Sequence, residues 1–555
     1  MLIFKRFNIP LYLALIGIAV LFIATQNIVF WQSFWHKMSF DTLRNILFAG
    51  SVVITLICGL VILFALTLWG KLRLPFIAVF LLFSTLFNYY SARYHIYMDR
   101  DMLINIFETN SIEVLDLISY QLIFWLILGV LVPLFFLSRL SICKISLWKS
   151  LLQRTLLILG SLAIVSVIAL GFYKDYASFF RNNQQILKLT MPVSYLASSL
   201  SYVKKQYADN LPFQTIGDDA HFNRPQTPQG AQKKTLFVMV VGETARSQNF
   251  SLNGYHKATN PLLSQQANLV SFQDVTACGT ATAVSVPCMF SQLTHDSFDK
   301  AHAQNQENAL DVLQKADYTL LWRENDHGCK GVCDRIPTEE VADFIDKNSA
   351  STASASASST GLYHDEALLF GLPEYINAHQ NAENLVIVLH MNGSHGPTYY
   401  QRYPDHFKHF QPSCDTKNIE TCERILLENV YDNTILYTDY VLNATIELLK
   451  QYDDEYETAM LYISDHGESL GENGFYLHGA PYMIAPKEQT TVPLIFWGSD
   501  AFYQDHALDQ DCLTRNAQTK SYSHDHIFHS LFGLLYVETQ SYDAHLDLFS
   551  ECHIR

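Results

Sequence analysis

Acidic residues and histidines follow three short apolar runs in the second half of the chain. The runs are 235–241, 384–389 and 459–463, and the residues beyond them are Glu243, His395, Asp465 and His466. Runs of this length that are rich in β-branched residues predict buried strands. In open α/β sheets, functional groups gather beyond the carboxyl ends of the strands. We therefore expect these four side chains to lie close together, although an Asp-His pair taken alone would more often cap a turn.

This combination of residue types suits a divalent cation. Carboxylates and imidazoles are good ligands for Zn²⁺, and a site with three protein ligands keeps a fourth position for a nucleophile or a water molecule. Manganese accepts the same oxygen ligands. The pattern therefore predicts a metal site and leaves the choice between zinc and manganese open.

A candidate nucleophile lies in the segment 278–288, which reads Cys-Gly-Thr-Ala-Thr-Ala-Val-Ser-Val-Pro-Cys. Its small hydroxyl residues are bracketed by two cysteines, and a disulfide between them would hold the segment rigid for chemistry. A hydroxyl bound to a metal loses its proton far more readily than a free one. An activated threonine could then attack a phosphate and form a covalent intermediate. Without the neighbouring metal motif, an ordinary turn rich in serine and threonine would be the preferred interpretation.

Eight of the ten cysteines lie after residue 270, and six of them form close pairs in the sequence. The pairs are Cys278 with Cys288, Cys329 with Cys333 and Cys414 with Cys422. Short-range pairs in a soluble domain predict disulfides and an oxidising compartment. A structural zinc site is the alternative, but none of the pairs has the two-residue spacing of a zinc knuckle. Cys512 and Cys552 could pair or stay free.

The predicted strands alternate with helical patterns such as 425–449. This alternation indicates an α/β domain with a mostly parallel central sheet and helices on its faces. Charge separates this part of the chain from the rest, because residues 217–555 carry 20 Lys and Arg against 45 Asp and Glu, whereas residues 1–216 carry 17 against 8. A domain this acidic is a poor candidate for binding nucleic acid.

The first 172 residues predict a membrane domain. Five apolar stretches are long enough, or nearly so, to cross a bilayer, and they cover 9–31, 46–69, 74–90, 118–137 and 155–172. The first stretch is too long for a signal peptide and has no small-residue cleavage site after it. Residues 173–216 follow with apolar positions at helical spacing, which predicts an amphipathic linker lying on the membrane, or a simple packing helix. The soluble catalytic domain is expected at 217–555.

Short loops predict the orientation of the spans. Basic residues without acidic neighbours precede the first span and fill the loops between spans two and three and between spans four and five. They are Lys5, Arg6, Lys71, Arg73, Arg139, Lys144, Lys149 and Arg154. The opposite loops carry acidic residues. The positive-inside rule then places the N-terminus in the cytoplasm and the C-terminal domain outside.

A polar strip lies between the third and fourth spans. Asn105, Thr109 and Glu113 are four residues apart, so they share one face of any helix there. Spacing alone favours a solvated face of a connecting helix over a strip that holds a lipid headgroup.

Several of these motifs together resemble those of a known enzyme family. They are Gly-Glu-Thr-Ala-Arg at 242–246, the segment 278–288, His-Gly-Pro at 395–397, Ser-Asp-His-Gly-Glu-Ser-Leu-Gly-Glu-Asn-Gly at 464–474 and His-Gly at 478–479. In this order they resemble the lipid A phosphoethanolamine transferases, a group of the alkaline-phosphatase and sulfatase-like superfamily that includes the colistin-resistance enzymes. The likeness covers nearly the whole chain.

The resemblance implies a role for individual residues. Glu243, Thr282, Asp465 and His466 would bind one catalytic zinc ion, with room for a second, transient one. Thr282 would be the nucleophile that carries phosphoethanolamine, and His395, His478 and Lys330 would contact that group or the leaving group. Asn105, Thr109 and Glu113 match the membrane-proximal substrate residues of the family, which reverses the interpretation from spacing alone.

The resemblance also implies an activity and a place in the cell. The chain would be a multi-pass protein of the bacterial inner membrane, active as a monomer, with its catalytic domain in the periplasm. It would transfer phosphoethanolamine from phosphatidylethanolamine to lipid A in lipopolysaccharide. The modification would lower the negative surface charge and give resistance to polymyxin and colistin.

One segment of the chain departs from the pattern of the family. The segment 361–366 stands where relatives carry a cysteine, after a low-complexity run at 349–359.

A sulfatase would need Cys or Ser followed by x-Pro-x-Arg, and no such sequence surrounds Thr282 or Cys288. A core sugar or another envelope glycan could be the acceptor. A phosphoglycerol transferase of the lipoteichoic acid type is another alternative, because it shares the membrane anchor and a threonine nucleophile at a metal site. A membrane-bound zinc or lipid receptor is the non-enzymatic alternative.

Overall fold

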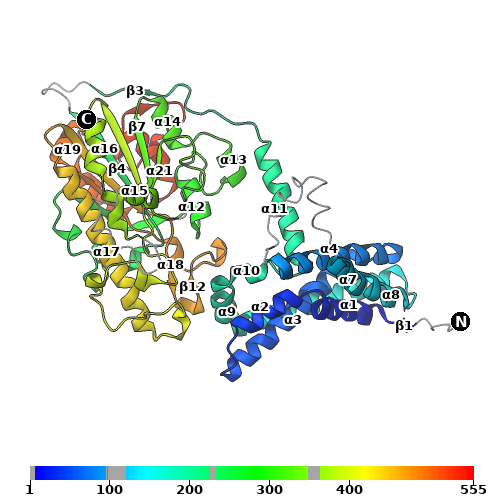
Figure 1. Ribbon diagram of the computed structural model, residues 1–555. Helices are drawn as coiled ribbons and strands as arrows, with labels where there is room; N and C mark the ends of the chain where they lie inside the picture. Colours follow the sequence, from blue (N-terminus) through cyan, green and yellow to red (C-terminus); the bar gives the residue numbers. More distant parts are fainter. Residues whose placement is uncertain are drawn as a thin grey trace. The chain divides into compact units, whose positions relative to one another are not determined.

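The computed structural model describes residues 7–94, 97, 120–225, 233–326, 328–347 and 363–554 (Figure 1). The chain divides into two compact units, Met1–Tyr207 and Ala208–Arg555. The predicted substrate residues Asn105, Thr109 and Glu113 lie outside the described residues.

The first unit is helical. Its helices are α1 (Leu11–Thr25), α2 (Ile28–Lys37), α3 (Leu43–Thr67), α4 (Arg73–Tyr94), α7 (Tyr120–Leu126), α8 (Val132–Ser138), α9 (Leu147–Asn182), α10 (Gln184–Leu187) and α11 (Val193–Asp209). A π-helical turn, Ile127–Leu131, joins α7 to α8, and the short strands β1 (Phe7–Ile9) and β2 (Leu140–Ile142) pair in parallel. Within the described residues, four helices are long and apolar enough to cross a membrane, or five if the bent pair α1–α2 counts as one span.

The bounds of these helices differ from the sequence prediction at two places. The stretch 9–31 is broken into α1 and α2, which meet at 64°. Asn27 stabilises the break, because its buried side chain donates to the carbonyls of Phe22 and Met191 and accepts from the amide of Met191. The last apolar stretch continues to Asn182 in α9, with non-helical dihedral angles only at Phe172. The range 173–216 therefore begins inside a long helix.

The second unit is built on a seven-stranded sheet with the order β5-β13-β10-β4-β9-β7-β8. The strands are β4 (Lys234–Gly242), β5 (Leu269–Phe272), β7 (Thr319–Glu324), β8 (Thr338–Glu340), β9 (Asn384–His390), β10 (Tyr456–Ser464) and β13 (Leu494–Gly498). Only β13 runs against its neighbours β10 and β5, and the other pairs are parallel. The predicted α/β domain with a mostly parallel sheet is confirmed.

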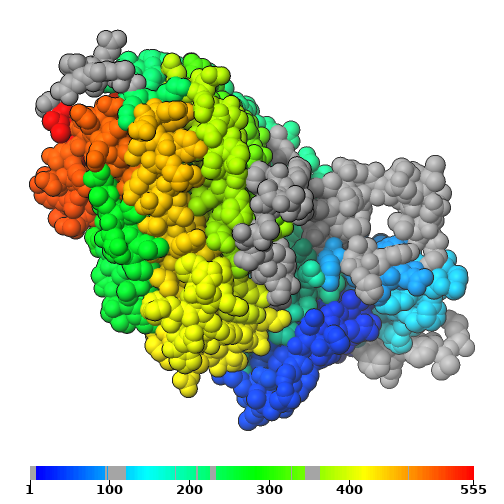
Figure 2. Space-filling view, turned by 60° about the vertical axis from the view of Figure 1, so that its left-hand side comes forward, coloured from blue at the N-terminus to red at the C-terminus, as the bar shows by residue number. Residues whose placement is uncertain are grey.

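Helices cover both faces of this sheet. They are α12 (Thr282–Met289), α13 (Lys300–Gln304), α14 (Ala309–Lys315), α15 (Val341–Lys347), α16 (Leu372–Ala378), α17 (Arg424–Lys450), α18 (Lys487–Thr490), α19 (Asp500–Asp505), α20 (Gln510–Thr519) and α21 (Asp525–Leu534). Short two-stranded pairings involve β3 (His221–Phe222), β6 (Asp274–Thr276), β11 (Ser469–Leu470), β12 (Tyr476–Leu477), β14 (Ser521–Ser523) and β15 (Val537–Glu538). In the space-filling view, α17 and the segment before it, coloured yellow to amber, form much of the visible face of this unit (Figure 2).

Two separate hydrophobic cores show why the sheet is buried on both sides. Along β4, Phe237, Met239 and Val241 belong to the core that includes α14 and α21. The alternate residues Leu236, Val238 and Val240 belong to the core that includes α17. Side chains of a strand alternate between the two faces, so a continuous apolar run is what a strand with helices on both sides requires.

Four disulfides join cysteines of the second unit. The structure forms Cys278–Cys288, Cys329–Cys333 and Cys414–Cys422, which are the pairs expected from their spacing. It also joins Cys512 to Cys552, a pairing that the sequence left open.

Candidate functional site

Two neighbouring strands, β4 and β10, bring the carboxylates of the site together. They pair in parallel register, with Gly242 opposite Ser464, so the residues that follow, Glu243 and Asp465, leave the sheet side by side. The backbone locks this arrangement, because the amide of Asp465 donates to the carbonyl of Gly242 at 2.9 Å and the amide of Thr244 donates to Asp465 Oδ1 at 3.1 Å. Both carboxylates and the following His466 are fully buried.

The hydroxyl of Thr282 lies against this cluster. Its Oγ1 is 2.9 Å from Glu243 Oε2 and 3.4 Å from His466 Nε2. The same Nε2 is 3.6 Å from Glu243 Oε1 and 3.3 Å from Asp465 Oδ2. Ligands held 2.0–2.1 Å from a tetrahedral zinc ion are separated by about 3.3 Å. The distances of His466 Nε2 to Asp465 Oδ2 and to Thr282 Oγ1 are close to this value, and ligand-type atoms of Glu243, Asp465 and His466 lie within 4.8 Å of one another.

The polar atoms of the cluster favour a cation. Within the described residues, Glu243 Oε1 and Asp465 Oδ2 are buried and accept no hydrogen bond. Burial, followed by the charges of Asp465 and Asp326, raises the pKa of Glu243 well above its usual value. His466 Nδ1 lies 3.0 Å from the carbonyl of Gly467, which leaves Nε2 facing the carboxylates. A divalent cation would supply the missing partner for both carboxylate oxygens.

Thr282 is fixed by its loop and by the loop that follows His478. It opens helix α12, and the disulfide Cys278–Cys288 spans the turn before the helix and most of the helix itself. The amide of Gly479 donates to the carbonyl of Thr280 at 2.7 Å, and Thr280 Oγ1 donates to the carbonyl of Ala480 at 2.7 Å. The nucleophile is therefore held by two loops that are distant in the sequence.

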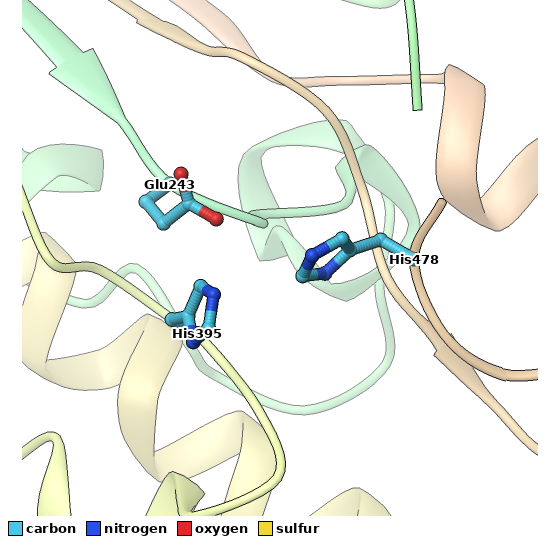
Figure 3. A group of neighbouring side chains, drawn as sticks. All are labelled: Glu243, His395 and His478. Carbon is cyan, nitrogen blue, oxygen red and sulfur yellow. The ribbon is translucent and has the colours of Figure 1, made fainter. Parts of the chain in front are cut away.

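His395 and His478 both lie beside Glu243 (Figure 3), and the His478 ring is 4.4 Å from the ring of His466. Ligand-type atoms of the three residues lie within 4.8 Å of one another, and the two imidazole rings are 5.3 Å apart. His478 Nδ1 is 3.3 Å from Glu468 Oε2, and Arg402 donates to the carbonyl of His395. The two histidines can therefore contact a group that is bound next to Glu243.

The turn that carries His395 makes a close backbone approach to Glu243. Gly393 has φ of +51°, and a Cβ there would lie 2.5 Å from the carbonyl oxygen of Glu243, so only glycine fits. The carboxylate of Asp365 accepts hydrogen bonds from the amides of Asn392 and Gly393 at 2.8 Å each. Asp365 belongs to the segment 361–366, which the sequence analysis noted only for its missing cysteine.

Lys330 lies at the edge of the cluster, where it pairs with Asp326. Its Nζ is 3.8 Å from Asp326 Oδ2, and ligand-type atoms of Asp326, His390 and Glu243 lie within 4.8 Å of one another. Sequence reasoning missed Asp326 and His390. The signal for His390 was present, because it is the last residue of β9 and the strand-end rule applies to it as much as to His395.

His524 is a further residue that the sequence did not reveal. Its Nδ1 accepts from the amide of Cys278 at 3.2 Å, and its Nε2 donates to the carbonyl of Ser464 at 3.0 Å. Burial lowers the pKa of His524 to about 4, so the ring is neutral and bridges the nucleophile loop to the end of β10. It lies far from every motif in the sequence, and no local pattern marks it.

Comparisons with known proteins give matches to both units of the chain. A family model described as Sulfatase matches residues 235–537, and one described as Phosphoethanolamine transferase EptA/EptB matches residues 56–207. The first match confirms the sulfatase-like type predicted for the soluble domain. The chain is 41% identical to the phosphoethanolamine transferase EptA of Escherichia coli (strain K12) over 95% of this chain and 94% of that relative.

Two further relatives cover the chain from end to end or nearly so. The phosphatidylethanolamine transferase Mcr-1 of Escherichia coli is 34% identical over 92% of this chain and 94% of its own length. The solved structure of the integral membrane protein lipooligosaccharide phosphoethanolamine transferase A from Neisseria meningitidis is 34% identical, has a TM-score of 0.64 and covers 99% of this chain and 100% of that chain.

Proposed function

Because the chain belongs to the phosphoethanolamine transferases that modify lipid A, we propose that it moves phosphoethanolamine from phosphatidylethanolamine to lipid A through a covalent intermediate on Thr282. The observation that carries this proposal is the position of the Thr282 hydroxyl, 2.9 Å from Glu243 and 3.4 Å from His466. A threonine in an ordinary turn has no reason to lie against two buried carboxylates and an imidazole.

In the first half of the reaction, Thr282 Oγ1 attacks the phosphorus atom of phosphatidylethanolamine. The new Oγ–P bond forms as the P–O bond to diacylglycerol breaks, and the Thr282 hydroxyl, which donates to Glu243 Oε2, gives up its proton to water. The departing glycerol oxygen needs a proton, and the ring of His395 or His478 is placed to give it. Thr282 also begins a helix, whose first backbone N–H groups favour a bound phosphate.

In the second half, a phosphate oxygen of lipid A attacks the same phosphorus atom and releases Thr282. The histidine that gave its proton in the first half accepts the proton of the attacking phosphate hydroxyl, and the leaving oxygen of Thr282 takes up a proton from water. Lys330 carries a positive charge at the edge of the cluster, beside Asp326, where it can balance the charge of the phosphoryl group.

Zinc is the metal that we assign to Glu243, Thr282, Asp465 and His466. When bound, it would lower the pKa of the Thr282 hydroxyl and stabilise negative charge on the phosphoryl oxygens. Two carboxylates, one imidazole and one hydroxyl make a ligand set that favours zinc over a metal that requires six oxygen ligands.

The chain works at the inner membrane, with its N-terminus in the cytoplasm and the domain 217–555 in the periplasm. Basic residues in the loops predicted to be cytoplasmic support this orientation, and four disulfides support an oxidising compartment for the second unit. Asn105, Thr109 and Glu113 would hold the donor headgroup at the membrane surface. The modified lipid A carries less negative charge, which gives resistance to polymyxin and colistin.

The test combines lipid analysis with trapping of the intermediate. Mass spectrometry of lipid A from cells that make the wild-type protein should show added phosphoethanolamine, and a digest of the protein incubated with phosphatidylethanolamine should carry the same group on the peptide that contains Thr282. Thr282→Val keeps the side-chain shape without the hydroxyl and should slow transfer by at least about 10³-fold. Thr282→Ser keeps the hydroxyl and should retain measurable transfer.

Each outcome has a clear meaning. Full transfer by Thr282→Val would contradict the covalent mechanism. Unmodified lipid A together with a modified core sugar or glycan would replace the acceptor and leave the covalent step in place.

A further inference from the structure

Two large apolar side chains stand out from the surface beside the nucleophile loop. Met483 is 98% exposed and Ile484 is 62% exposed, on the turn Tyr482–Ile484. Val284, two residues after Thr282 on α12, is a third exposed apolar residue of this region. The other exposed large hydrophobic residues described in the second unit are single and scattered: Phe213, Leu262, Ile425 and Ile554. Single exposed apolar residues are normal on a protein surface, whereas contiguous apolar surface marks an interaction site.

The segment 481–487, which we name the apolar tip, is fastened to the nucleophile loop. Tyr482 donates its hydroxyl proton to the carbonyl of Ala277 at 2.9 Å, and its ring lies 4.4 Å from that of His295. The residues just before the tip, Gly479 and Ala480, exchange hydrogen bonds with Thr280. Whatever holds the tip therefore also positions the loop that carries Thr282.

The composition of the apolar tip is unusual for this acidic unit. It reads Pro-Tyr-Met-Ile-Ala-Pro-Lys, and the first carboxylate after it is that of Glu488. Lys487 at its base is exposed and makes no ion pair within the described residues. Segments that lie in the interface of an anionic bilayer combine apolar side chains with basic residues that face the headgroups.

We propose that the apolar tip inserts Met483 and Ile484 into the boundary between headgroups and acyl chains of the membrane, with Lys487 among anionic headgroups. The insertion holds the nucleophile loop at the depth of a lipid phosphate. The tip remains a membrane contact even if the acceptor is not lipid A, so only its consequence for transfer rests on the proposed function.

A depth measurement tests the contact without reference to activity. The full chain carries Cys143→Ser, which removes the exposed free cysteine, and Met483→Cys labelled with a fluorescent probe, in nanodiscs of phosphatidylethanolamine and phosphatidylglycerol. The matched control places the label at Ile554, which is 64% exposed on the same unit. We expect quenching groups on lipid chains to act at least about three-fold more strongly at 483 than at 554, and iodide in the water to act less strongly. Equal accessibility to iodide at both positions would overturn the proposal. Quenching by lipid chains that occurs only when phosphatidylethanolamine is present would show that the tip binds the donor lipid. This result would also overturn the proposal that the tip inserts into the membrane.

Kinetics give a second, independent test. The double substitution Met483→Ser and Ile484→Ser should lower kcat/KM for a long-chain donor in nanodiscs by about ten-fold and leave the rate with a water-soluble short-chain donor unchanged. Ile554→Ser is the control and should affect neither rate. Equal losses with both donors would show that the tip acts inside the site and would contradict membrane insertion. If the covalent intermediate on Thr282 were absent while the depth result held, the proposed function would fail and the membrane contact would stand.

Discussion

Strand β10 carries buried carboxylate chemistry at both ends, and the two ends are completed in different ways. Glu457 is the second residue of the strand, and Asp465 follows its last residue. Both side chains are fully buried. The comparison is informative because the strand, the burial and the kind of group are shared.

At the start of β10, the protein supplies its own cation. Arg224 forms ion pairs with Glu457 and Asp505, and Glu457 Oε1 also accepts from Thr235 Oγ1 at 2.7 Å and lies 3.2 Å from His506 Nε2. Burial alone would raise the pKa of Glu457, but the hydrogen bond from His506 and the charge of Arg224 lower it. At this end the fold itself supplies the positive charge that pairs with Glu457.

At the other end, the fold gathers negative charge without neutralising it. The pKa of Glu243 is raised by burial and by two nearby carboxylates, and one oxygen each of Glu243 and Asp465 is left without a hydrogen bond among the described residues. A buried charge that the protein does not balance destabilises the fold. The difference teaches that a buried carboxylate cluster is structural when its cation is built in, and functional when the cation must come from outside.

A pair of isosteric substitutions provides the strongest test of this difference. Asp465→Asn removes a proposed metal ligand and should lower transfer by at least about 10³-fold, because the Thr282 hydroxyl loses its activation, while its fold remains about as stable as that of the metal-free wild type. Glu457→Gln leaves Arg224 buried with only Asp505 as its acidic partner, and should lower the free energy of unfolding by about 3 kcal/mol. Its transfer rate per folded molecule should be unchanged. Transfer from fluorescent phosphatidylethanolamine and thermal melting of the full chain in detergent measure the two effects.

The comparison would be wrong if the effects were exchanged. An inactive, stable Glu457→Gln or an active, unstable Asp465→Asn would mean that the metal chemistry is not at the carboxyl end of β10.

Removing the metal should also distinguish the two ends of β10, through a smaller effect on the melting temperature. A ligand present at 100 to 1,000 times its Kd stabilises a fold by about 3 to 4 kcal/mol. Treating the wild-type protein with a chelator should therefore lower its melting temperature, and zinc should restore it. Glu457→Gln should show the same zinc-dependent shift from a lower starting point, whereas Asp465→Asn should show almost none. A zinc-dependent shift of full size in Asp465→Asn would place the ion elsewhere in the chain.

The sequence predicted the part of the site that depends on strand register. Glu243, Asp465 and His466 follow apolar runs, and parallel pairing of β4 with β10 in register brings their side chains together. Thr282 was predicted as the nucleophile from the composition of its loop and from the family resemblance. These predictions needed only local patterns and a general rule for the carboxyl ends of parallel strands.

The remainder depends on contacts between distant residues that carry no local signal. His524 and Cys278 are 246 positions apart, and Arg224 and Glu457 are 233 apart, so no spacing rule connects them. The direction of β13 was also not predicted. The described segment between β10 and β13 holds the short strands β11 and β12, two 3₁₀ turns and the four-residue helix α18, and none of these is long enough to be the crossover helix that usually joins parallel strands. In the membrane unit, the break at Asn27 rests on its contact with Met191, 164 positions away.

The smallest effect that distinguishes the two ends of β10 is the pH dependence of stability, measured by melting of the full chain in chelator from pH 7.5 to pH 3.5. Burial lowers the pKa of His506 below its usual 6.5, and the pKa of Glu457 lies below its usual 4.5. Both groups bind more protons in the unfolded chain, so both lose stabilising effect as pH falls, His506 from about 6.5 downward and Glu457 from about 4.5 downward. In Glu457→Gln, the loss of stability that begins near pH 4.5 disappears. The loss that begins near pH 6.5 becomes larger, because the Glu457 carboxylate no longer raises the pKa of His506 against the effect of burial. Its melting temperature should therefore fall more steeply than that of the wild type just below pH 6.5 and less steeply below pH 4.5. Parallel curves would show that Glu457 does not act as a charged partner and would remove the contrast with Asp465.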